Sequence, residues 1–141
     1  MKISNGMNRN KLSKQLAALV FFIFIANTVS QRFYWYTSIW YFDMFMHFIS
    51  GFWLGLAFSW LWWPRSGARG SKLLAKIAVS VFVIGLSWEV FEYFFYNVVD
   101  SNTFNPIDTV SDLCFDLAGG FTALWYLRRS LISDKENAII S

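Results

Sequence analysis

Seven ionisable side chains lie in otherwise apolar segments of this chain, at the spacing of residues on one face of a helix. They are Asp43, His47, Glu89, Glu92, Asp108, Asp112 and Asp116. Within each segment, neighbouring members of the set are three or four residues apart. An acidic residue at the centre of a membrane-spanning helix costs about 2.5 to 3.5 kcal/mol on an insertion scale. Ionisable residues at membrane depth therefore indicate a functional site.

The charge balance of this set indicates what the site binds. Six carboxylates face one histidine and one loop arginine, Arg32. Six close anions in a medium of low dielectric cannot all stay ionised without compensation. Either several carboxylates are protonated or a bound cation supplies the missing charge. Carboxylate oxygens and one imidazole suit Mg²⁺, Mn²⁺, Ca²⁺ or Zn²⁺.

We predict a divalent metal site with one further residue as general acid or base. The predicted metal ligands are Asp43, His47, Glu92, Asp112 and Asp116. Glu89 is the predicted acid or base. Each residue alone also has a structural interpretation: Asp108 suits the positive end of a helix, and His47 suits a hydrogen-bonded interior position. The convergence of three segments favours a functional site.

The elements that carry these residues are typical of a membrane protein. Hydrophobic residues make up 56% of the 141 residues and charged residues only 15%. A spanning helix needs about 20 mostly apolar residues. Four segments qualify, near residues 12–31, 42–63, 77–99 and 109–127. We therefore predict an all-α fold, a single integral-membrane domain over residues 1–141 with four transmembrane helices in a compact bundle.

The basic residues orient these predicted spans. Eleven of the twelve Lys and Arg residues fall on one side, and Arg32 alone falls on the other. The positive-inside rule then places both termini in the cytoplasm and all seven ionisable groups in the outer half of the membrane. Because the basic residues flank spans and form no patch, nucleic acid is not an expected partner.

Two features of the sequence have alternative interpretations. The basic start and the apolar stretch near residues 16–26 also resemble a cleavable signal peptide, although no A-x-A cleavage site follows. The aromatic stretch over residues 33–42 is typical of a belt at the membrane boundary, and a lid over the site is the alternative. Cys114 is the only cysteine, so no disulfide forms within one chain.

The order of the acidic motifs resembles two families of membrane proteins, the VanZ-like proteins and, more closely, the bacterial inner-membrane family typified by YjdF. The motifs are FDMFMH, WEVFEY and DTVSDLCFDLAGG, within residues 40–127. VanZ-like proteins tend to have Gln at the position of Glu92 and Asn at that of Asp116, and YjdF-like chains are usually longer. The resemblance implies a multi-pass protein of the bacterial inner membrane and specifies no reaction.

Three functions are consistent with these residues. The first is an enzyme that uses a carboxylate–metal site on a membrane lipid or a lipid-linked envelope substrate. The second is a cation transporter or proton relay. The third is a non-catalytic protein that binds an envelope ligand or serves in assembly. A homo-oligomer is compatible with each of these functions. Transport would require one, because four helices alone form only a thin conduit.

Overall fold

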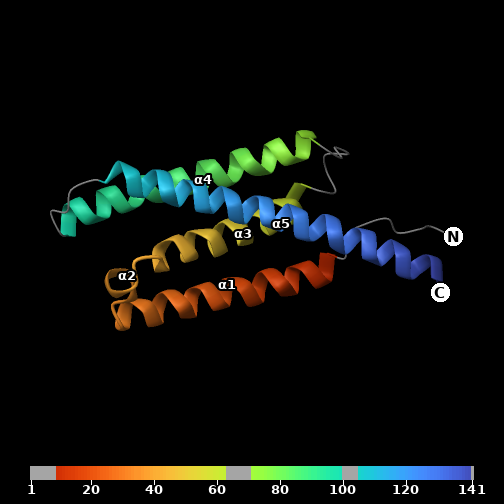
Figure 1. Cartoon of the computed structure of the whole chain (residues 1–141), viewed down its shortest axis with the longest axis horizontal. Helices are drawn as coiled ribbons and strands as arrows, with labels where there is room; N and C mark the ends of the chain where they lie inside the picture. Colours follow the sequence, from red (N-terminus) through yellow and green to blue (C-terminus); the bar gives the residue numbers. More distant parts are fainter. Residues whose placement is uncertain (1–8, 63–70, 100–104, 141) are drawn as a thin grey trace.

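The computed structural model describes residues 9–62, 71–99 and 105–140 and contains five helices in these ranges. They are α1 (Arg9–Arg32), α2 (Trp35–Ser38), α3 (Phe42–Trp62), α4 (Ser71–Val99) and α5 (Pro106–Ile140). No strand occurs in the described part of the chain, so the predicted all-α class is confirmed. Four of the helices are long and lie side by side in a bundle (Figure 1).

Three helices are long and apolar enough to cross a membrane, which makes the chain a multi-pass membrane protein. They are α1, α3 and the Lys72–Phe94 part of α4. Helix α5 contains the whole predicted fourth span, 109–127, but it is not among them, so the predicted count of four is not confirmed. The reason lies in its sequence, because Asp108, Asp112 and Asp116 fall in its first three turns.

The long helices alternate in direction. Helices α3 and α5 run the same way, and α1 and α4 run the opposite way (Figure 1). The beginning of α1 and the end of α5 therefore lie at the same end of the bundle, as the predicted topology requires. The side of the membrane on which this end lies remains a prediction.

Helices α3 and α5 form the closest packed pair. A Cβ atom on Gly51 would overlap the main-chain carbonyl of Asp116, and one on Gly119 would overlap the carbonyl of Phe48 and the amide nitrogen of Phe52. Small residues allow two membrane helices to approach in this way. The short distance between the backbones places the acidic face of α5 against that of α3.

The apolar core fills the end of the bundle that is opposite the acidic residues. One buried cluster joins α1, α3 and α5, and a second joins α4 and α5. The members are Leu12, Leu56, Ala123 and Leu127 in the first cluster, and Leu73, Ile77, Val81 and Leu124 in the second. Two hydrogen bonds of 2.9 Å also hold α1, from Trp53 Nε1 to the Leu16 carbonyl and from Gln15 Nε2 to Tyr126 Oη. The buried ionisable side chains His47, Asp112 and Asp116 lie towards the other end.

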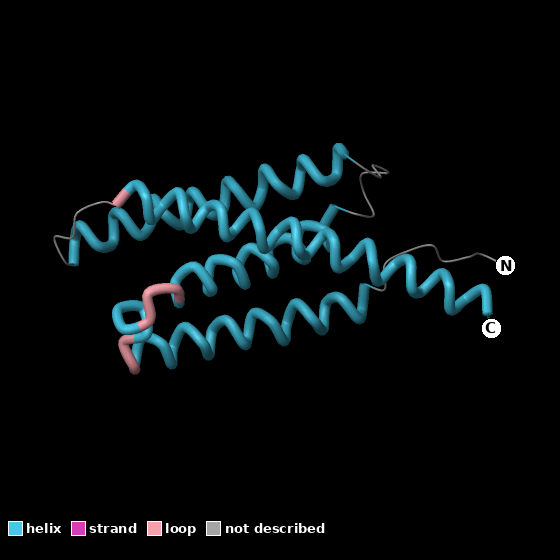
Figure 2. Tube along the Cα trace, viewed as in Figure 1, coloured by secondary structure: helices cyan, strands magenta, loops and turns pink. Residues whose placement is uncertain are grey.

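Aromatic side chains hold the connection between α1 and α3, which consists of the short helix α2 between two loops (Figure 2). The Trp35 and Tyr36 rings pack edge-on against Phe42, with centroid distances of 5.5 and 5.1 Å. The Tyr36 hydroxyl donates a hydrogen bond of 2.8 Å to Asn27 Oδ1 near the end of α1. Phe42 is 7% exposed and directly precedes Asp43, so this packing holds the first turn of α3 in place.

Candidate metal centre

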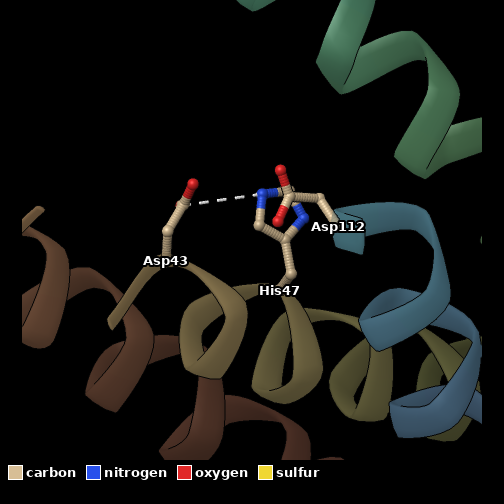
Figure 3. A group of neighbouring side chains, drawn as sticks. All are labelled: Asp43, His47 and Asp112. Carbon is tan, nitrogen blue, oxygen red and sulfur yellow. Dashed lines mark ion pairs between the residues drawn. The ribbon is translucent and has the colours of Figure 1, made fainter. Parts of the chain in front are cut away.

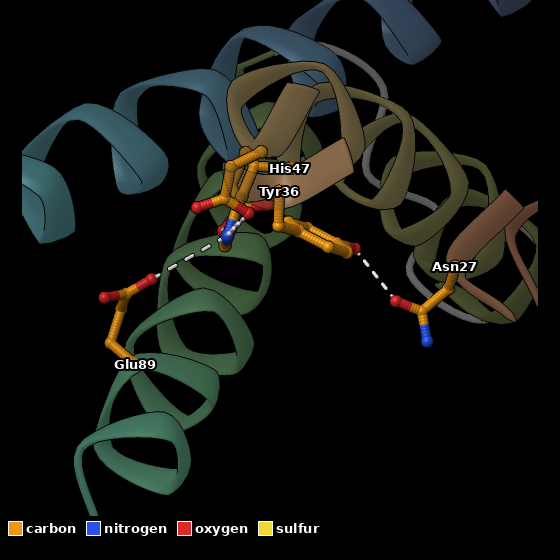
Figure 4. A network of polar contacts seen from close by, with 6 residues as sticks. Asn27, Tyr36, His47 and Glu89 are labelled. Atoms are coloured by element: carbon orange, nitrogen blue, oxygen red, sulfur yellow. Dashed lines mark hydrogen bonds and ion pairs between the residues drawn. The ribbon is translucent and has the colours of Figure 1, made fainter. Parts of the chain in front are cut away.

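His47 lies at the centre of the polar cluster and is 6% exposed. Its Nε2 atom lies 3.7 Å from Asp43 Oδ1 and 3.9 Å from Glu89 Oε1 (Figures 3 and 4). Its Nδ1 atom lies 3.4 Å from Asp116 Oδ2. The two ring nitrogens therefore face different carboxylates, and the histidine links α3 to both α4 and α5.

Helical spacing explains how the side chains reach one another. Asp43 and His47 are four residues apart and lie on the same face of α3. Asp112 reaches the histidine from α5, as the close-up of these three residues shows (Figure 3). Glu89 and Glu92 are three residues apart on α4, so their carboxyl groups approach the same ring from another side.

Two groups of side chains have ligand atoms close enough to share a metal ion. The first consists of Asp43, His47 and Asp112, and the second of His47, Glu89 and Glu92. Within each group the ligand atoms all lie within 4.8 Å of one another. His47 belongs to both groups, so an ion at its ring could take carboxylate oxygens from α3 and α5 in the first group or from α4 in the second. Such oxygen-rich sets with one imidazole suit Mg²⁺, Mn²⁺, Ca²⁺ or Zn²⁺.

Two oxygens of this cluster are buried without a hydrogen-bond partner among the described residues. They are Glu89 Oε1 and Asp112 Oδ1, one from each ligand group. The side chain of Glu89 is 9% exposed and Asp112 is 3% exposed. A buried polar atom left without a partner costs about 1 to 3 kcal/mol. Both oxygens therefore fit the donor set of a cation, which would give them a partner.

The surroundings leave the negative charge of the cluster largely uncompensated. In the described ranges, the ion pairs that these carboxylates form are all with His47, and they involve Asp43, Glu89 and Asp116. One imidazole can carry at most one positive charge. A divalent cation would therefore improve the charge balance as well as the coordination.

The structure brings together most of the predicted site residues but separates two acids from the ligand groups. Asp43, His47, Glu92 and Asp112 lie in those groups, and Glu89, predicted as an acid or base, also lies there. Asp116 lies at the other ring nitrogen and in neither group. Asp108, at the start of α5, is exposed and in neither group as well.

Gly85 is a residue of the site that sequence reasoning missed. A Cβ atom at this position on α4 would overlap Oδ2 of Asp116, so the absence of a side chain makes room for that carboxylate. Gly85 precedes Glu89 by four residues and therefore lies on the acidic face of α4. This spacing was the signal that could have identified it.

The comparisons with known proteins point to one family. A family model described as predicted membrane protein (DUF2238) matches residues 3–132, and this is the YjdF-like family. The VanZ-like resemblance is not shown. No curated protein and no solved structure matches the chain.

Proposed function

The chain belongs to the DUF2238 family of predicted membrane proteins, and we propose that it binds a divalent cation in the outer half of a bacterial inner membrane. The observation that carries this proposal is the pair of buried oxygens without a hydrogen bond, Glu89 Oε1 and Asp112 Oδ1, one in each of the two ligand groups that share His47. A buried carboxylate oxygen without a hydrogen bond is unfavourable unless a bound ion or a proton satisfies it.

The proposed topology has α5 as a fourth span. Its acids lower its hydropathy, but Asp112 and Asp116 are each only 3% exposed because they face α3 and α4. Lipid would therefore not contact these two carboxylates. The 35 residues of α5 extend over about 52 Å, which is longer than the hydrocarbon core of a bilayer.

The proposed ligands are Asp43, His47, Glu89, Glu92 and Asp112. Asp43 lies in the first turn of α3, and its side chain is 37% exposed. His47 follows the start of α3 by five residues, which places it about 7.5 Å along the helix. The ion would thus lie in the outer half of the membrane, closer to the start of α3 than to its middle.

We propose that the substrate is a membrane lipid or a lipid-linked envelope precursor with a phosphoryl group. A divalent cation at this depth would polarise a phosphoryl oxygen or lower the pKa of a bound water molecule. The apolar part of such a substrate would stay in the bilayer beside the exposed aromatic side chains of Phe45 and Trp88.

Cation transport is the weaker candidate because the polar path does not continue through the bundle. Between Asp116 and the opposite end of the bundle, the buried side chains of the described residues are mostly apolar, among them Leu56, Ile77 and Leu124. A proton or ion pathway would need ionisable groups or water-filled space at that depth. An assembly role without catalysis would leave the metal site intact but give no turnover.

Elemental mass spectrometry of the purified protein tests the metal site. Protein in mild detergent is incubated with Mn²⁺, Zn²⁺, Mg²⁺ or Ca²⁺, and free ions are removed. We expect stoichiometric metal in the native protein and loss of it in Asp112→Asn. Asp108→Asn is the matched control, because Asp108 lies one turn earlier on α5 and is exposed. Absence of metal from the native protein under every condition would refute the proposal.

Phosphate release from lipid phosphates tests the reaction. The metal-loaded native protein and the metal-free Asp112→Asn variant are compared in mixed micelles. Metal-dependent release supports an enzyme, and metal binding without release assigns the site to ligand binding or assembly.

A further inference from the structure

We propose that Asp116 is a positioning residue that fixes the ring of His47, and that His47 binds the ion through Nε2. This inference rests on the proposed metal site and revises the sequence-based prediction that Asp116 is itself a ligand. Asp112 and Asp116 lie on the same face of α5, and the proposal gives them different roles: Asp112 is a ligand and Asp116 orients the histidine.

The first argument is the geometry around the ring. Asp116 Oδ2 lies 3.4 Å from Nδ1, at the long end of hydrogen-bond distances, whereas Asp43 and Glu89 approach Nε2. A neutral imidazole has one N–H, and an ionised carboxylate only accepts hydrogen bonds. Of these three carboxylates, only Asp116 lies within hydrogen-bond distance of a ring nitrogen, so the hydrogen belongs on Nδ1, where it is donated to Asp116. The lone pair on Nε2 then points towards the ligand groups.

The second argument is the slot that holds the Asp116 side chain. Two glycines on different helices leave room for this residue: a Cβ on Gly85 would overlap its carboxylate, and one on Gly51 would overlap its main-chain carbonyl. The residue is 3% exposed. A carboxylate confined between α4 and the His47 ring is well placed to orient that ring.

The third argument is that Asp116 belongs to neither ligand group, although it is the nearest carboxylate to the ring. Metal-binding histidines usually donate their other ring N–H to a carboxylate, carbonyl or water, which fixes the tautomer and makes the ligand more basic. Loss of such a partner typically lowers metal affinity by about 10- to 100-fold. We expect a loss of this size when Asp116 cannot reach Nδ1.

Nitrogen NMR can test the tautomer directly, because His47 is the only histidine in the chain. The protein is labelled with ¹⁵N-histidine and studied without metal at a pH where the ring is neutral. We expect the proton on Nδ1, and a ring protonated mainly on Nε2 would overturn the proposal. Addition of Zn²⁺ should then shift the Nε2 resonance, and coordination through Nδ1 would also overturn it.

A pair of glycine variants tests the slot. Gly85→Ala places a methyl group against the Asp116 carboxylate, whereas Gly120→Ala on the same helix pair places one 3.1 Å from a methyl group of Val81. We expect Gly85→Ala to increase the Nε2–H tautomer and to lower Zn²⁺ affinity by about 10-fold, the lower end of the range for losing such a partner. Gly120→Ala should leave the tautomer unchanged. Equal tautomer populations in the two variants would overturn the inference.

Substitutions of Asp116 separate positioning from packing. Asp116→Asn keeps an oxygen that can accept a hydrogen bond from Nδ1–H, so we expect His47 to retain the Nδ1–H tautomer. Asp116→Leu removes the acceptor, and persistence of the Nδ1–H tautomer there would contradict the proposal. If Asp116→Leu does not fold, the comparison of tautomer populations in Gly85→Ala and Gly120→Ala tests the proposal instead. Because the metal-free tautomer is measured without any ion, failure of the metal site and failure of this inference remain distinguishable.

Discussion

Gly51 on α3 lies against the main-chain carbonyl of Asp116 on α5, so close that a Cβ atom at Gly51 would overlap the carbonyl oxygen. Gly119 repeats the relationship from α5, against the carbonyl of Phe48. His47 precedes Gly51 by one helical turn, and Asp116 precedes Gly119 by nearly one turn. The backbone contact between the helices and the polar contact between His47 and Asp116 therefore belong to one interface.

Substitution of either glycine should destabilise the protein. In Gly51→Ala and Gly119→Ala the new methyl group meets backbone atoms, which cannot rotate away, so we expect a loss of about 1 to 3 kcal/mol or more. Thermal unfolding in detergent measures the effect. Gly120→Ala is the control, because its methyl group meets the Val81 side chain, and the expected loss is smaller. Equal melting temperatures for all three variants and the native protein would contradict the interpretation.

Metal should stabilise the folded protein. An ion that binds only the folded state at about 100 times its dissociation constant stabilises that state by about 2.7 kcal/mol. We expect the added ion to raise the melting temperature of the native protein and a chelator to reverse the rise. Glu92→Gln removes one candidate ligand, so the ion should raise its melting temperature less. A rise of the same size in Asp112→Asn would show that the ion acts elsewhere.

Two hydrogen bonds should anchor α1 to the bundle. Trp53→Phe removes the bond to the Leu16 carbonyl, and Tyr126→Phe removes the acceptor of Gln15 Nε2. We expect each variant to lose about 0.5 to 1.5 kcal/mol of stability, measured by thermal unfolding. Ser87→Ala should be nearly neutral, since that hydroxyl is exposed and bonds the Val83 carbonyl of its own helix. Losses no larger than that of Ser87→Ala would show that these bonds do not stabilise the bundle.

Thiol labelling in intact cells tests whether α5 spans the membrane. Cys114 is first replaced by Ser, and single cysteines are then introduced at Asn105 and Arg128, which lie near opposite ends of the span and are exposed. A membrane-impermeant maleimide should label Asn105→Cys from outside, but Arg128→Cys only after permeabilisation. Labelling of both positions from the same side would show that α5 does not cross.

Much of the candidate site could be predicted from residue spacing. A helix repeats every 3.6 residues, so Asp43 and His47 must share a face, as must Glu89 and Glu92. The cost of placing charges in a membrane implies that these faces turn towards one another. The structure does bring these four residues together with Asp112, from three helices.

The sequence by itself determined the helical class, the apolar segments and the face on which each ionisable residue lies, because these follow from composition and helical periodicity. Only the tertiary structure decided the distances and rotations between helices, since these depend on which backbones can touch. The contacts at Gly51 and Gly119 set the approach of α5, and Gly85 leaves room for one carboxylate. For this reason Asp116 faces Nδ1 of His47, although its spacing along the chain matches that of Asp112.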